Sequence, residues 1–163
     1  MRHALIRVAA AGAVAIAAAL PAQAAGTVQV SYLQPENFSD VGFGSFERDR
    51  SLDKLTDVFK KLAERLPDGQ VLKLDVSQVD LAGRLQPTHR GQDLRVMTGR
   101  ADWPQIKLHY TLLAGDTVLK SGDARLTDLN YLQNARLGDN QRSELPYEKR
   151  MIDTWFDKTF VAH

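Results

Sequence analysis

Two short segments place charged, carboxylate and aromatic side chains beside predicted strands. One precedes a strand and contains Arg100, Asp102 and Trp103; the other follows the next strand and contains Asp128 and Tyr131. Strands joined by a short glycine-containing turn pair as an antiparallel hairpin, so both segments are expected at one edge of the sheet, away from the turn. These five residues are the predicted ligand-binding site. The alternative is that the carboxylates cap loops or pair with Arg100, while the rings seal the end of the core.

Aspartates on or beside predicted strands leave open a second chemistry, hydrolysis by a pair of carboxylates. One carboxyl group with a raised pKa would donate a proton while the other acts as a base or nucleophile. The competing interpretation, which the sequence favours, is that these aspartates are solvent-facing charges, caps and ion-pair partners. We therefore predict no catalytic residue. The aspartates concerned are Asp75, Asp80, Asp102, Asp123 and Asp128.

Other catalytic and metal chemistries find little support in the residue types. The chain has no cysteine, which excludes disulfides, thiolate metal ligands and a thiol nucleophile. The histidines of the mature part, His89, His109 and His163, lack the spacing that places two metal ligands on one helix face. Ser45 follows Gly42-Phe43-Gly44 but lacks the strand-to-helix setting of a serine nucleophile. We predict no metal and no cofactor.

The N-terminal segment has the three regions of a secretory signal peptide. Arg2, His3 and Arg7 form a basic start, an apolar stretch of 13 residues follows at 8–20, and Pro21-Ala22-Gln23-Ala24 supplies a small-x-small cleavage site. The apolar stretch is shorter than the roughly 18 to 20 residues that a helix needs to cross a bilayer. We expect cleavage near Ala24, a periplasmic or secreted product, and no membrane insertion afterwards.

The predicted mature part has the size of one domain and almost no net charge. Cleavage would leave 139 of the 163 residues, and 19 of the 21 basic residues against 20 acidic ones, a formal charge of −1. A chain of that length buries about two-thirds of its unfolded surface. Interspersed charges of both signs give no electrostatic reason to bind nucleic acid. A single domain over 25–163 that does not bind nucleic acid is the prediction.

Hydrophobic periodicity predicts an α+β domain in the order β-α-β-β-β-α. We expect two helices packed on one face of a small, mostly antiparallel sheet. The stretch 36–50 is predicted as an ordered loop that packs Phe38, Phe43 and Phe46, and 82–103 as irregular with a possible short strand at 94–98. The elements expected are a strand over 27–33, a helix capped by Ser51 and running to Leu66, a strand over 72–81 bulged near Ser77-Gln78, a hairpin over 106–126, a loop over 127–145 and a last helix from Pro146 to Phe160.

Segments spread over nearly the whole predicted mature chain carry a family resemblance. The most specific are GRADWP at 99–104 and LTDLNYL at 126–132, and others are VSYLQPENFSDVG, FERDRSLDKL, LDVSQVDLAGRLQP and YEKRMIDTWF. In these segments the chain resembles an exported bacterial family called domain of unknown function 3016. The resemblance implies an exported, single-domain bacterial context and supplies no catalytic residue.

Three functional hypotheses follow. The leading one is a non-catalytic binding or accessory module of the cell envelope, whose partner is an envelope protein or a small ligand held near Arg100 and Trp103. The first alternative is a small hydrolase that uses a carboxylate pair. The second is a structural protein that self-associates through a sheet edge.

Overall fold

The computed structural model describes residues 25–88, 93–134 and 144–161. The predicted signal peptide, His89 and His163 lie outside these described residues. The elements in chain order are β1 (Thr27–Tyr32), η1 (Pro35–Asn37), α1 (Ser45–Ala63), β2 (Gln70–Asp80), β3 (Arg84–Pro87), β4 (Asp93–Val96), β5 (Gln105–Ala114), β6 (Thr117–Thr127), α2 (Pro146–Phe156) and η2 (Asp157–Val161).

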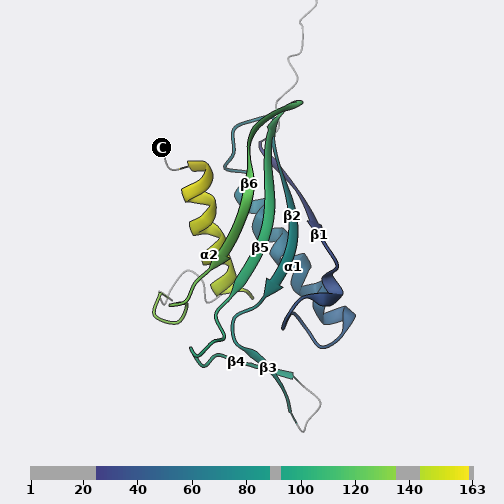
Figure 1. The fold of residues 1–163 in the computed structure, drawn as a ribbon, viewed down its shortest axis with the longest axis vertical. Coiled ribbons are helices and arrows are strands. Elements are labelled where there is room, and N and C mark those ends of the chain that lie inside the picture. Colours follow the sequence, from purple (N-terminus) through teal and green to yellow (C-terminus); the bar gives the residue numbers. More distant parts are fainter. Residues whose placement is uncertain (1–24, 89–92, 135–143, 162–163) are drawn as a thin grey trace, which may run out of the picture.

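A four-stranded sheet in the order β1-β2-β5-β6 forms the centre of the fold (Figure 1). β1 pairs parallel to β2, with α1 as the crossover that parallel strands need, and the other two pairs are antiparallel. Within this sheet and its helices the element order is the predicted β-α-β-β-β-α, and the α+β class is confirmed. β3 and β4 form a separate two-stranded ribbon that projects from one end of the sheet (Figure 1).

The sheet buries one face under both helices. Leu72, Leu74 and Val76 of β2 lie in the same core cluster as Leu55 of α1 and Ile152 of α2. This alternation is the period-2 pattern from which the strands were predicted. The opposite face carries exposed polar side chains and is uncovered within the described part of the chain. The described residues contain no helix that is both long and apolar enough to span a membrane.

Two irregularities expected from the sequence occur where predicted. β2 shifts its register against β5 between Val76 and Gln78, which is the expected bulge. β5 and β6 join through a two-residue turn, and Gly115 takes a φ of 57° there, which favours glycine. The edge strands of the sheet are β1 and β6. Self-association through either of them stays a prediction.

The first helix corrects two expectations. It begins at Ser45 rather than after Ser51, and it ends at Ala63 rather than at Leu66. The Glu47 carboxylate accepts a hydrogen bond from the Phe43 backbone N–H at 3.1 Å, which stabilises the earlier start. The expected packing of three phenylalanines over 36–50 is also wrong for two of them, because Phe43 and Phe46 are 61% and 78% exposed.

Candidate functional site

The β3–β4 ribbon is held at its base by one arginine that bonds to two distant segments. Nη1 of Arg95 donates to the Ala82 carbonyl at 3.0 Å, and Nη2 donates to the Asp40 carbonyl at 2.7 Å. Gly83 N–H also donates to the Asp102 carbonyl at 2.8 Å. An isolated two-stranded ribbon is marginally stable in water, so these bonds determine where the ribbon lies.

A second set of contacts surrounds Asp40 and Arg84. Oδ1 of Asp40 accepts the Leu85 backbone N–H at 3.2 Å. Arg84 forms ion pairs with Asp40 at 3.4 Å and with Asp80 at 3.3 Å, and donates to the Ala101 carbonyl at 2.7 Å. Burial raises the pKa of Asp80, the Arg84 charge opposes that shift, and the Asp40 charge adds to it. Two carboxylates therefore flank one guanidinium in a hollow of about 430 Å³.

Asp102, a predicted site residue, lies buried and caps its own loop. It is 1% exposed, and its Oδ2 accepts the Thr98 backbone N–H at 2.6 Å and the Thr98 hydroxyl at 2.9 Å. Burial alone would raise the pKa of Asp102, but the Thr98 hydrogen bonds and one from the Tyr131 hydroxyl outweigh it, so the pKa lies below its ordinary value. The Tyr131 hydroxyl accepts the Gly99 N–H at 3.2 Å.

Asp128 and Tyr131 are fixed by an arginine that sequence reasoning did not connect with them. Nη2 of Arg150, on α2, donates to Oδ2 of Asp128 at 2.7 Å and to the Tyr131 carbonyl at 2.8 Å. Oδ1 of Asp128 accepts from the backbone of Asn130 and the side chain of Asn134. Both carboxylates thus cap loops, as the alternative expected, but among the described residues neither pairs with Arg100, so that part of the alternative is wrong.

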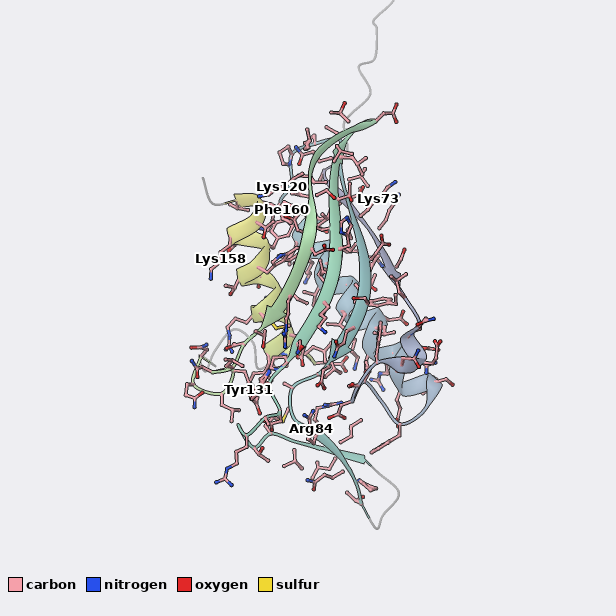
Figure 2. The ribbon with its side chains drawn as sticks, in the orientation of Figure 1. Lys73, Arg84, Lys120, Tyr131, Lys158 and Phe160 are labelled. Carbon is pink, nitrogen blue, oxygen red and sulfur yellow. The ribbon has the colours of Figure 1, made fainter. Side chains whose placement is uncertain are left out.

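The predicted site segments do meet at one end of the sheet. Gln105 pairs with Thr127, which brings the segment before β5 and the segment after β6 together, and Figure 2 shows Tyr131 and Arg84 at this end. Trp103 is half-buried. Arg100 is exposed, and its side chain makes no hydrogen bond or ion pair within the described ranges. Ligand binding by these residues and Asp102 stays a prediction.

Exposed apolar side chains accompany Arg100 at this end. Leu94 and Met97, in β4 and just after it, are 58% and 37% exposed. Leu129, in the loop after β6, and Phe43, which lines the same hollow as Leu85, are each 61% exposed. We call Leu94, Met97 and Arg100, which come from β4 and the bend that follows it, the hairpin surface. No periodic pattern predicted it, because β3 and β4 are short and polar in sequence.

The open face of the sheet holds a polar network that sequence reasoning missed. Nδ1 of His109 lies 2.8 Å from Oδ1 of Asp123, and Nε2 lies 3.1 Å from Oγ of Ser121, which Thr111 Oγ1 contacts at 3.2 Å. The hairpin predicted from the sequence could have revealed this network, because its register places His109 opposite Asp123. The bonding order is that of a serine-histidine-aspartate triad. Asp123 is 91% exposed and His109 46%, so water screens the charges and the network lacks the enclosed setting that such catalysis uses.

The described residues contain no cluster of three or more His, Asp or Glu side chains that could hold a metal ion. The carboxylates near the hairpin are instead bonded to backbone N–H groups and arginines. The arrangement can hold a projecting ribbon in a fixed position and present apolar side chains on it.

Comparison with known proteins adds a family and no function. No curated protein and no solved structure shows a significant match to this chain. One family model, described as "Protein of unknown function (DUF3016)", matches residues 26–158. This match covers both helices of the core, all strands, the hairpin surface and the predicted site, and the chain therefore belongs to the DUF3016 family.

Proposed function

We propose that this protein is an exported, non-catalytic binding module of the cell envelope that docks a protein partner through the hairpin surface. The observation that carries the proposal is the exposure of Leu94 and Met97 on a ribbon fixed by Arg95. Exposed apolar side chains grouped at one place on a small domain mark interaction sites.

The polar groups near the β3–β4 ribbon support binding rather than catalysis. Oδ2 of Asp102 accepts the Thr98 N–H, and Asp128 accepts the Asn130 N–H and bonds Arg150. Leu94, Met97 and the guanidinium of Arg100 are exposed at this end and available to a partner. Arginine and apolar side chains are common in the centres of protein interfaces.

Export is the second part of the proposal, and it rests on the sequence. The basic start, the 13-residue apolar stretch and the small-residue cleavage site before Ala25 support a secretory leader. The mature part contains no cysteine, so its fold does not depend on an oxidising compartment. A periplasmic or secreted protein is the product we propose.

The experiment is partner capture with two matched double variants. Tagged protein is incubated with envelope extract as the wild type, as Leu94→Ser/Met97→Ser, and as Val118→Ser/Leu119→Ser. Val118 and Leu119 are 56% and 49% exposed at the opposite end of the sheet, next to the β5–β6 turn, and serve as the control. We expect the hairpin variant to reduce capture of a discrete partner by about tenfold or more, and the control to retain it. Equal capture by all three proteins would contradict the proposal.

A second candidate function is supported by Asp40 and Asp80. Both line the hollow of about 430 Å³, and the pKa of Asp80 is raised, chiefly by burial. Two carboxyl groups in one hollow, one of them with a raised pKa, are the kind of arrangement that hydrolysis by a carboxylate pair uses. Screening glycosidase and peptidase substrates with wild-type protein and Asp80→Asn tests it. Turnover that the variant abolishes would favour the hydrolase, and no turnover by either protein would remove it.

A further inference from the structure

A hollow crosses β2, β5 and β6 on the face of the sheet that the helices leave open. Its volume is about 620 Å³, which is within the range of small-ligand sites. β5 lies between the other two strands (Figure 1). The charged and titratable side chains that line it are exposed and alternate with those that face the helices: Asp75, Lys107, His109, Asp123 and Arg125. We call it the open-face hollow.

The register of the three strands orders these side chains into two rows. His109 of β5 is the register partner of Asp75 on β2 and of Asp123 on β6. We call these three residues the acidic row. Lys107 and Arg125 are partners in the next row on the same face, which we call the basic row. A ligand in the hollow would therefore meet carboxylates at one end and cations at the other.

The basic row is by itself unfavourable to the sheet. Lys107 and Arg125 stand directly opposite each other on neighbouring strands, where Cβ atoms are about 4.5 to 5.5 Å apart and like charges destabilise the pair. The carboxylate of Asp123 contacts Nδ1 of His109 at 2.8 Å, within its own row. An anion between Lys107 and Arg125 would relieve their repulsion.

The spacing of the rows sets the length of a ligand that reaches both. Residues two apart on a strand, such as Asp123 and Arg125, are separated by about 7 Å along it. Six bonds of an extended aliphatic chain span about 7 to 8 Å, given a C–C bond of about 1.5 Å. Between the rows lie the register partners Leu108 and Ala124, and Leu33, 49% exposed, adds apolar surface beside them.

We propose that the open-face hollow binds a small ω-amino acid, a linear chain with an ammonium at one end and a carboxylate at the other. The ammonium donates to Asp75, and the carboxylate lies between Lys107 and Arg125, whose guanidinium can donate two parallel hydrogen bonds to it. The acidic row repels a polyanion, so the hollow favours a ligand of both signs. This site is separate from the hairpin surface and does not depend on the docking proposed there.

Titration of the full chain with 6-aminohexanoate, followed by backbone amide NMR shifts, is the first arm of the test. We expect saturable binding with the shifts concentrated in β2, β5 and β6. Hexanoate and hexylamine carry one charge each, and the two charges of 3-aminopropanoate are too close together to reach both rows. All three should bind about fivefold more weakly, since an exposed ion pair is worth up to about a factor of five.

Variants of each row form the second arm. Lys107→Ala/Arg125→Ala and Asp75→Asn should each weaken binding of 6-aminohexanoate by about fivefold. The matched control Lys60→Ala/Lys61→Ala, which removes two exposed cations from α1, should change it less than about twofold. The amide spectra establish that each variant is folded.

Four results would overturn the proposal. They are no saturable binding by the wild type, equally tight binding of hexanoate or hexylamine, unchanged binding after loss of either row, and equal weakening by the two double variants.

Discussion

Glu148, in the first turn of α2, accepts a hydrogen bond from the backbone N–H of Ala82 at 2.7 Å. The carbonyl of the same Ala82 accepts from Arg95, which holds the ribbon. One peptide segment after β2 is thus fixed on one side by the helix and on the other by the ribbon. The last helix therefore helps to position the hairpin surface, although it belongs to the core.

Substitutions of Glu148 should separate the effect of its charge on the free energy of unfolding from the effect of its hydrogen bond. Burial raises the pKa of Glu148, and the bond from Ala82 lowers it only in part. The folded state therefore binds the proton more tightly than the unfolded state, so the free energy of unfolding should fall as pH rises above about 4.5. Glu148→Gln should lack this fall, whereas Glu148→Ala should lose about 2 kcal/mol at neutral pH. Urea unfolding across pH checks both, and parallel pH curves for wild type and Glu148→Gln would contradict the assignment.

Asp102 should show the opposite pH dependence. Although burial opposes it, hydrogen bonding lowers the pKa of Asp102, so its contribution to stability is complete above the ordinary value of 3.8 and is lost as pH falls through the folded-state pKa. Wild type should lose more stability than Asp102→Asn between about pH 5 and pH 3. Asp102→Ala leaves the Thr98 N–H without its acceptor and should cost about 2 kcal/mol at pH 7. A tolerated alanine would show that the loop does not need this cap.

Arg95→Ala should release the ribbon without unfolding the domain. The variant removes the bonds to the Ala82 and Asp40 carbonyls but leaves the core cluster untouched. Backbone amides of β3 and β4 should exchange hydrogen faster by about tenfold or more, while those of β2 and β5 should keep their rates. Leu94→Ala, on the same strand and 58% exposed, serves as the matched control. Uniform acceleration over all strands would mean that Arg95 supports the whole fold.

The Ser121–His109–Asp123 network should contribute neither reactivity nor much stability. Solvent-exposed pairs are worth about 0 to 1 kcal/mol, so Ser121→Ala and His109→Ala should each change the free energy of unfolding by less than about 0.5 kcal/mol. A fluorophosphonate probe should leave Ser121 unmodified in the folded wild type, with Ser121→Ala as the blank. Labelling of Ser121 that disappears in His109→Ala would contradict this and establish an activated serine.

The sequence predicted the elements that bury apolar side chains at a regular period. Leu72, Leu74 and Val76 gave the strand, Met151 and Ile152 contributed to the helix, and the turn at Gly115 set the hairpin. The first turns of α1 were missed because Phe46 and its neighbours face solvent, so they show no buried periodicity.

The site was less predictable because its contacts join distant parts of the chain. The pairing of β5 with β6 brings Asp102 and Asp128 to the same end of the sheet, and this placement follows from the local rules for hairpins. The side chains that fix these carboxylates and the ribbon could not be predicted from local rules. Arg150 meets Asp128 from a helix 22 residues away, and Arg95 meets the Asp40 carbonyl 55 residues away. No local pattern encodes such pairs.

The most direct test of docking through the hairpin surface is photo-crosslinking in cells. A photoreactive amino acid is placed at position 94 on the ribbon or at position 118 at the opposite end, both of which are exposed. We expect a discrete crosslinked partner protein from position 94, none from position 118, and loss of the crosslink when Met97 is changed to Ser. The same crosslinks from both positions, or none from either, would contradict docking through the hairpin surface.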